Sequence, residues 1–155
     1  MEVVLEACGR LRLPLKVVGS GPEMDNLKKK AGKNVEFLGW VSDQERVKLL
    51  QNAKALIVAS EDEDFGITSI EAQAAGTPVI APASGGFLET VIDGRTGILY
   101  GGSGQVTVDS LIAGIQRFND LNHFNSEDLR KNAQKFSKER FKKEMLELTE
   151  KNLPK

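Results

Sequence analysis

The stretch from Ala55 to Ala81, Ala-Leu-Ile-Val-Ala-Ser-Glu-Asp-Glu-Asp-Phe-Gly-Ile-Thr-Ser-Ile-Glu-Ala-Gln-Ala-Ala-Gly-Thr-Pro-Val-Ile-Ala, decides the fold class. It opens with an apolar run, Ala55 to Ala59, typical of a strand covered on both faces. After an acidic segment, a helical pattern runs from about Thr68 to Ala75 and stops at Gly76, a common C-cap residue. A second apolar run, Pro78 to Ala81, follows. This strand–helix–strand order with short connections predicts a parallel sheet.

The same alternation continues on both sides of this unit. We expect further strands at Leu15–Val18, Val35–Leu38 and 97–99, and helices at about 23–31, 43–52, 108–118, 126–136 and 137–152. The glycine-rich stretch 101–104 is expected to be a flexible joint before the C-terminal helices. The expected fold is therefore α/β, with a Rossmann-like doubly wound parallel sheet and a helical C-terminus, in a single domain over residues 1–155.

Composition and charge exclude several classes of function. The chain has 155 residues, 40% of them hydrophobic and 28% charged, which is ordinary for a globular domain. Its net charge of −1 lacks the excess of positive charge that is typical of nucleic-acid-binding proteins. No apolar run approaches the roughly 20 residues of a membrane-spanning helix, and no secretion signal is found. Cys8 is the only cysteine and His123 the only histidine, so zinc chemistry and a Ser-His-Asp triad are not expected. A single cysteine also excludes an internal disulfide, and we therefore expect a reducing, cytoplasmic setting.

The ligand-binding edge follows from the fold class. In doubly wound sheets, ligands bind at the carboxyl ends of the strands, where helix N-termini point. Here these places are Gly19–Pro22, Gly39–Asp43, 60–69 and 82–86. Glycines in these turns allow the backbone to approach a ligand closely.

The segment from Ser60 to Glu71 carries the most chemical information. The free N–H groups of the first helical turn form an anion site that the helix dipole favours. Thr68 and Ser69 are expected to offer hydroxyl groups to a phosphate, and Glu71, one turn further on, is suited to a vicinal diol such as a ribose. Glu63 precedes the turn and is placed to contact a second hydroxylated group. The segment thus suits a nucleotide-sugar.

Two alternatives remain open for the acidic residues. Carboxylates near the start of a helix stabilise it in any protein, so the segment is also consistent with an acidic surface loop. A divalent metal held by Glu61, Asp62, Glu63 and Asp64 is disfavoured, because adjacent residues lack the alternating spacing of a calcium loop.

Glu63 and Glu71 enclose seven residues, and the sequence between and after them resembles the Glu-x(7)-Glu signature of family-4 (group 1) retaining glycosyltransferases. Other landmarks resemble that family in the same order along nearly the whole chain. They are Val17-Val-Gly-Ser-Gly-Pro-Glu23, Val35-Glu-Phe-Leu-Gly-Trp-Val41, Gly85-Gly86 and Glu89-Thr-Val-Ile-Asp-Gly-Arg-Thr-Gly97. The Glu-Asp-Phe-Gly-Ile variant is similar to mannosyltransferases of polysaccharide and lipopolysaccharide assembly.

The resemblance implies the C-terminal, nucleotide-sugar-binding half of the two-domain GT-B fold. It implies that Glu63 contacts the donor sugar as the catalytic-site carboxylate and that Glu71 binds the ribose. It further implies that the backbone amides of Phe65, Gly66, Ile67 and Thr68 hold the sugar and diphosphate, and that Gly19, Gly21, Gly39 and Val41 frame the base. The implied substrate is a donor such as GDP-mannose or UDP-glucose, whose hexose passes to a glycan or lipid-linked acceptor. The reaction needs no metal and no cofactor in the family, since protein groups neutralise the departing diphosphate.

The sequence departs from the family pattern at its start. Residues 1–7 match the first helix of the family's domain, whereas the strand before it, with an Arg and a Lys that grip the donor phosphates, and the N-terminal acceptor domain have no counterpart. We therefore expect an open slot beside the strand Leu15–Val18, which either Met1–Leu5 as a strand or a partner chain fills. The chain alone is expected to be inactive. A non-catalytic module that binds a nucleotide-sugar is the alternative.

Three smaller features have ordinary and functional interpretations. From Arg130 onward there are nine Lys or Arg and four Glu, with Phe141, Met145 and Leu148 at helical spacing. This helix either packs its apolar stripe on a core, which is the favoured interpretation, or lies on an anionic membrane surface. Trp40 either packs against a helix, again favoured, or stacks on a base. His123 is expected in a loop and Cys8 in the core.

Overall fold

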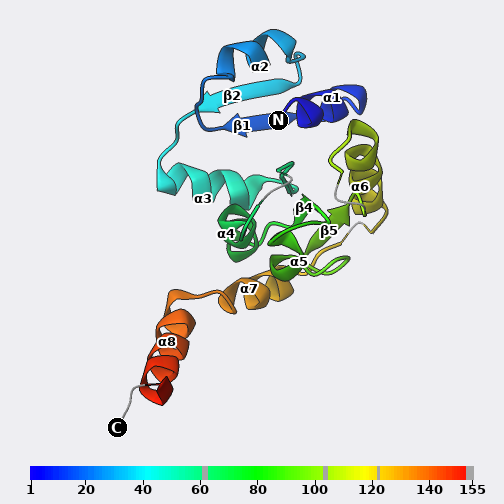
Figure 1. The fold of residues 1–155 in the computed structure, drawn as a ribbon. Helices are drawn as coiled ribbons and strands as arrows, with labels where there is room; N and C mark the ends of the chain where they lie inside the picture. The colour runs from blue at the N-terminus through cyan, green and yellow to red at the C-terminus, as the bar shows by residue number, and fades with distance from the viewer. Residues whose placement is uncertain (61–62, 103–104, 122, 153–155) are drawn as a thin grey trace.

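The computed structural model describes residues 1–60, 63–102, 105–121 and 123–152 and has alternating strands and helices. In chain order the elements are α1 (Glu2–Arg10), β1 (Leu15–Val18), α2 (Met24–Lys30), β2 (Val35–Gly39), α3 (Asp43–Asn52), β3 (Leu56–Ile57), α4 (Ile67–Ala75), β4 (Val79–Pro82), α5 (Phe87–Thr90), β5 (Gly97–Tyr100), α6 (Val108–Leu121), α7 (Ser126–Gln134) and α8 (Lys138–Asn152) (Figure 1). The predicted α/β class is confirmed.

The described strands form two parallel sheets. In the first, β1 pairs with β2, and Leu15 lies opposite Val35. In the second, the order is β3-β4-β5, and Val79 of β4 lies opposite both Leu56 and Gly97. Gly97 allows β5 to approach β4 closely, because a Cβ atom there would lie 2.1 Å from the Val79 carbonyl oxygen.

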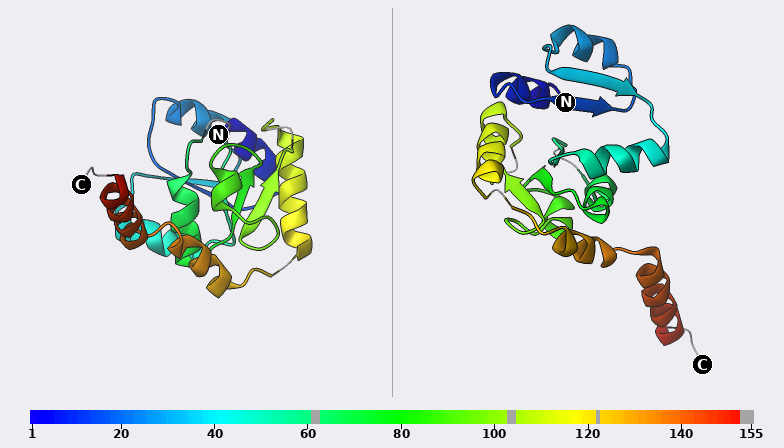
Figure 2. Two further views of the ribbon diagram at one scale, coloured as in Figure 1. Left: turned by 60° about the horizontal axis from the view of Figure 1, so that its bottom comes forward. Right: turned by 180° about the vertical axis from the view of Figure 1, so that it is seen from behind.

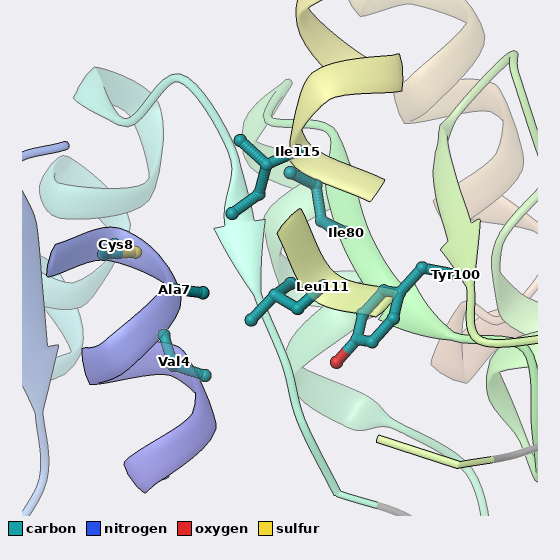
Figure 3. Packing of buried hydrophobic residues seen from close by; sticks show 7 residues of the cluster. All are labelled: Val4, Ala7, Cys8, Ile80, Tyr100, Leu111 and Ile115. Carbon is teal, nitrogen blue, oxygen red and sulfur yellow. The ribbon is translucent and has the colours of Figure 1, made fainter. Parts of the chain in front are cut away.

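The main apolar cluster joins α1, α6 and the second sheet. It contains Val4, Ala7 and Cys8 of α1, Ile80 of β4, Tyr100 of β5, and Leu111 and Ile115 of α6 (Figure 3). Leu15 of β1 and Ile57 of β3 pack against it from the two sheets. One core therefore serves both sheets, and burial raises the pKa of the Cys8 thiol within it.

Strand β4 is the centre of the second sheet, and all four of its residues are buried. Ile80 faces the main cluster, whereas Val79 and Ala81 face a second cluster with Ala72 of α4 and Phe87 of α5. This is the alternation expected of a strand with both faces covered. It places α4 against the face of the sheet opposite α1 and α6.

The two sheets are not hydrogen-bonded to each other. Within the described residues, β1 pairs only with β2, and β3 pairs only with β4, so each sheet has an open edge. The views in Figures 1 and 2 show β1 and β2 separated from β4 and β5. The expected interruption beside β1 is thus present. Of the two alternatives for filling it, the one in which Met1–Leu5 becomes a strand is wrong, because Glu2–Arg10 is a helix with Val4 and Leu5 buried.

Helix α8 extends away from the rest of the molecule (Figure 2). None of its residues is buried, and Phe141, Met145 and Leu148 are 64%, 44% and 55% exposed. The favoured expectation that this stripe packs on a core is therefore wrong within this chain. Among the described helices, none combines the length and the apolar character needed to cross a bilayer.

Candidate functional site

The candidate site is built on the turn between β3 and α4. The Glu63 carboxylate accepts a hydrogen bond from the Gly66 N–H at 3.1 Å and one from the Ser60 hydroxyl at 3.3 Å. The carboxylate is therefore fixed at the start of the helix by its own loop. Glu61 and Asp62, which belong to the same acidic segment, lie outside the described residues.

Gly66 sets the direction in which α4 leaves the turn. It is buried and left-handed, with φ at 76°, and precedes the first helical residue, Ile67. A side chain here would also meet the ring of Phe87, whose Cε1 lies 2.8 Å from the ideal Cβ position. The sequence must therefore have glycine at this point for both conformational and steric reasons.

The first turn of α4 has free main-chain donors. The N–H groups of Ser69 and Ile70 donate to the Gly66 carbonyl, whereas those of Ile67 and Thr68 have no partner within the described chain. Ile67, Thr68 and Phe65 are exposed. This is the geometry of an anion site at a helix N-terminus.

A second glycine turn supports the Glu63 loop from behind. The Gly86 N–H donates to the Glu63 carbonyl at 2.8 Å. A Cβ atom at Gly85 would lie 2.4 Å from that carbonyl oxygen, and one at Gly86 would lie 2.5 Å from the Asp64 carbonyl oxygen. The pair Gly85-Gly86 thus serves the close packing of two loops.

Beneath α4, buried polar side chains connect three helices. The Ser69 hydroxyl donates to the Gly66 carbonyl at 2.7 Å and lies 3.0 Å from the Thr90 hydroxyl. The Asn132 amide of α7 donates to Gln73 of α4 at 2.7 Å and to the Thr90 carbonyl at 2.9 Å. The expectation that Ser69 offers its hydroxyl to a phosphate is wrong, because Ser69 is fully buried and its hydroxyl holds the turn.

Glu71 lies one turn along α4, and its only partner among the described residues is Arg46 of α3. The Arg46 Nη2 atom lies 3.1 Å from Oε1 of Glu71 and 3.2 Å from Oδ1 of Asp43. Arg46 lies in the first turn of α3, the helix that follows the loop after β2. The structure therefore brings Glu71 together with the second predicted binding loop, from Gly39 to Asp43.

That loop is fixed by the start of α3. Ser42 and Glu45 form a capping box, in which the Ser42 N–H donates to Glu45 at 2.9 Å. The hydrogen bond from the Ser42 backbone lowers the pKa of the Glu45 carboxyl. Trp40 is 80% exposed, so the expectation that it packs against a helix is wrong.

Two cavities lie on opposite sides of α3. The first, of about 530 Å³, includes Trp40 and Val41, and the second, of about 260 Å³, includes Arg46 and Glu71. The predicted base-framing residue Val41 and the predicted ribose ligand Glu71 therefore line different cavities, with the first turn of α3 between them.

The turn after β1 contributes a third part of the same edge. Gly19 has φ at 114°, Gly39 has φ at 66°, and the Gly19 N–H donates to the Gly39 carbonyl at 2.7 Å, which ties the ends of β1 and β2 together. A Cβ atom at Gly21 would meet nothing within 4 Å. In the described chain, no hydrogen bond or ion pair joins the turn from Gly19 to Gly21 to the segment from Glu63 to Glu71.

Sequence reasoning missed the supporting residues of the site. Arg46, Thr90 and Asn132 are far from Glu63 and Glu71 in the sequence, and nothing in their spacing indicates the contact. His123 is exposed in the loop before α7, as expected. Within the described ranges, no group of three His, Cys, Asp or Glu side chains is arranged to hold a metal ion.

The sequence model of the family described as "Glycosyl transferases group 1" matches residues 1–140.

The chain belongs to the group 1 glycosyltransferases.

Individual relatives agree with this assignment. The chain is 37% identical over 89 residues to a glycogen synthase of Mycobacterium tuberculosis, a match that covers 54% of this chain and 22% of the relative. It is 48% identical over 65 residues to the alpha-1,3/1,6-mannosyltransferase ALG2 of Dictyostelium discoideum, with coverage of 42% and 16%. The chain thus spans less than a quarter of the length of these curated relatives.

Solved structures give the same fold. A sucrose-phosphate synthase from Thermosynechococcus elongatus superposes with a TM-score of 0.82 at 28% identity, covering 97% of this chain and 41% of that one. The Anabaena protein Alr3699/HepE, solved in complex with UDP and glucose, superposes with a TM-score of 0.72 at 22% identity and covers 97% of this chain and 44% of that one. The fold is the Rossmann-like half of a GT-B glycosyltransferase.

Proposed function

We propose that this chain is the donor-binding part of a retaining glycosyltransferase and that it holds a nucleotide-sugar between Glu63 and Glu71. The observation that carries the proposal is the arrangement around Gly66. A fixed carboxylate precedes the left-handed glycine, the amides of Ile67 and Thr68 that follow it have no partner among the described residues, and a second carboxylate lies one turn further on. The order along the site is then sugar, diphosphate and ribose.

Each group has a distinct role in the proposed reaction. The amides of Ile67 and Thr68, together with the dipole of α4, stabilise the charge that develops on the diphosphate as its bond to the sugar carbon breaks. Glu63 accepts hydrogen bonds from sugar hydroxyls and so positions the reacting carbon. Glu71 accepts hydrogen bonds from the ribose diol. The oxygen of the acceptor hydroxyl forms the new bond to that carbon, its proton passes to an oxygen of the departing diphosphate, and the nucleoside diphosphate leaves.

We propose a hexose such as mannose or glucose as the transferred sugar, from a donor such as GDP-mannose or UDP-glucose. The support comes from the relatives, which include a mannosyltransferase and a glycogen synthase, and from the UDP and glucose bound by the Anabaena protein. We further propose that Gly19, Gly21, Gly39 and Val41 frame the base. The open space above Gly21 and the exposed Trp40 ring support this location.

We also propose that turnover requires a partner, which is either an acceptor domain or another chain. The open edges of β1 and β3 and the uncovered stripe of α8 are the two surfaces that such a partner would cover. Contact of α8 with an anionic membrane is the alternative use of the stripe, and vesicle sedimentation would detect it. A cytoplasmic location is in keeping with Cys8, which is buried and unpaired.

Calorimetric titration of the chain with UDP, GDP, ADP and their sugars tests the proposal. We expect saturable binding of one nucleotide series, weakened in Glu71→Ala by roughly 1–3 kcal/mol for the lost charge-assisted hydrogen bonds. Glu127→Ala is the matched control, because Glu127 is ion-paired on α7, away from the site, and its loss should leave the affinity unchanged.

Sugar transfer is measured on the same samples. Binding without transfer by the chain alone is the expected result, whereas transfer by the pure chain would contradict the need for a partner. If adding the acceptor part restores no transfer while nucleotide-sugar binding persists, the chain is a non-catalytic binding module instead. An absence of binding in all three series would overturn the proposed site.

A further inference from the structure

Arg46 is the one residue in the described chain that forms an ion pair with Glu71, and the sequence signature does not include it. Its Nη2 atom lies 3.1 Å from Oε1 of Glu71, while Oε2 of Glu71 has no hydrogen bond to a described residue. The contact joins the first turn of α3 to the second turn of α4. It therefore bridges two elements that reach the site from separate strands, β2 and β3.

The two ion-paired residues also line a cavity. Arg46 and Glu71 border a space of about 260 Å³ between α3 and α4, whose other lining residues are Val47, Leu50 and Gln51 of α3 with Ala74 and Ala75 of α4. The Glu71 side chain is 33% exposed and that of Arg46 is 42% exposed. At this exposure an ion pair stabilises a fold only weakly. The same contact nevertheless restricts the rotamers of a carboxylate that would otherwise turn freely in solvent.

We propose that Arg46 is a positioning residue for nucleotide binding: it holds Glu71 by one carboxylate oxygen and directs the other toward the ribose diol. The inference rests on the proposed function, in which Glu71 is the ribose ligand. Fixing a carboxylate before the ligand arrives saves the entropy of ordering it on binding, so Arg46 raises affinity by about two- to tenfold without itself touching the nucleotide.

A double-mutant cycle with ribose and deoxyribose ligands tests this role. Affinities for UDP, GDP and ADP, and for the 2′-deoxy form of each, are measured calorimetrically for the wild type, Arg46→Gln, Glu71→Ala and the double variant. We expect Arg46→Gln to lose about two- to tenfold in affinity for the ribonucleotide that binds and to discriminate less between the ribose and deoxyribose forms. In the Glu71→Ala background, Arg46→Gln should have no further effect.

Controls separate positioning from folding and from charge. Arg95→Gln removes the same charge and also breaks an ion pair, the one between Arg95 and Asp128, which does not involve Glu71. This variant should bind the nucleotide as the wild type does. Arg46→Lys should recover part of the discrimination, because an ammonium group still reaches the carboxylate without the planar fork. Thermal unfolding of Arg46→Gln should match that of the wild type within a few degrees.

Three results would overturn the inference. If Arg46→Gln weakens binding equally in the presence and absence of Glu71, Arg46 contacts the nucleotide directly. If Arg46→Gln binds the nucleotide as the wild type does while Glu71→Ala binds it more weakly, the ion pair does not contribute to nucleotide binding. The proposed function of Glu71 is then supported without the positioning role of Arg46. If no nucleotide binds to the wild type, the proposed function and this inference fail together.

Discussion

Among single residues, Gly66 has the most demanding position in the site. Its φ of 76° disfavours a side chain, and a Cβ atom would press on the Phe87 ring at 2.8 Å. We predict that Gly66→Ala lowers the free energy of unfolding by about 2–4 kcal/mol, from the left-handed conformation and the overpacking together. Urea denaturation measures it. Gly9→Ala is the control: Gly9 is helical with nothing within 4 Å, so this change should stabilise the chain by about 0.5–1 kcal/mol. Equal effects of the two changes would contradict the account.

Asp93 is a residue whose charge stabilises the fold in a pH-dependent way. Burial acts to raise its pKa, but the hydrogen bonds from Arg117, at 2.9 and 2.8 Å, and from the Leu99 N–H outweigh burial, so the pKa lies below its ordinary value. The stabilisation is therefore complete above the unfolded pKa of about 4 and is lost as the pH falls through the lower folded pKa. We predict that Asp93→Asn costs about 1–2 kcal/mol at pH 7, a modest value because the side chain is 39% exposed. Denaturation of both proteins at pH 7 and pH 3 should show this difference shrinking in acid; a constant difference would exclude the ionised pair as its source.

The site residues were only partly predictable from sequence. The positions of Glu63 and Glu71 follow from one loop and one helix, because local spacing fixes them. The Arg46 contact and the burial of Ser69 could not be predicted, since both depend on how α3, α5 and α7 pack against α4. Local pattern thus predicts which side chains are available, while tertiary packing decides which of them remain free for a ligand.

At the scale of elements, α7 and α8 differ in what they contribute to the fold, although they are adjacent in the chain. Helix α7 buries Leu129, Asn132 and Ala133, whereas α8 buries none of its residues. We predict that truncation after Ser137, which removes α8, changes the free energy of unfolding by less than about 1 kcal/mol, because little apolar surface is lost. Truncation after Asn125 removes α7 as well and should cost more than about 4 kcal/mol, since Leu129 and the Asn132 hydrogen bonds go with it. Denaturation curves of the two truncated chains distinguish these cases, and a large loss on removing α8 alone would show that its stripe is covered in solution.

The boundaries of the elements show the same division between local and tertiary causes. The predicted helix 43–52 matches α3 because Ser42 and Glu45 cap it locally. The predicted strand Ala55–Ala59 is reduced to Leu56–Ile57, since β3 pairs on one side only. The four-residue helix α5 was not expected, because it is too short to show a period in the sequence and depends on burial of Phe87 and Thr90.

At the scale of the whole molecule, the interruption between the sheets is the feature that the resemblance to the family implied but did not resolve. The alternation of strands and helices predicts the order of elements, yet it contains no information on whether the first segment becomes a strand. The apolar residues Val4, Ala7 and Cys8 decide this by packing α1 against α6 in the shared core. The superposition with sucrose-phosphate synthase over 97% of the chain includes both sheets, so their relative placement is that of a known glycosyltransferase.

Amide hydrogen exchange tests whether the edges of β1 and β3 are open in solution. Consecutive peptide groups along a strand point to opposite sides. The Leu15 N–H of β1 donates toward β2 and the Leu56 N–H of β3 toward β4, so the N–H groups of Lys16 and Ile57 point into the interruption. We predict that Lys16 and Ile57 exchange much faster than Val17 and Val58, in spite of the shared core, and that a partner strand would slow only the first pair. Uniform protection along β1 in the isolated chain would show that the interruption closes in solution, and the partner proposed for these edges would then have no place to bind.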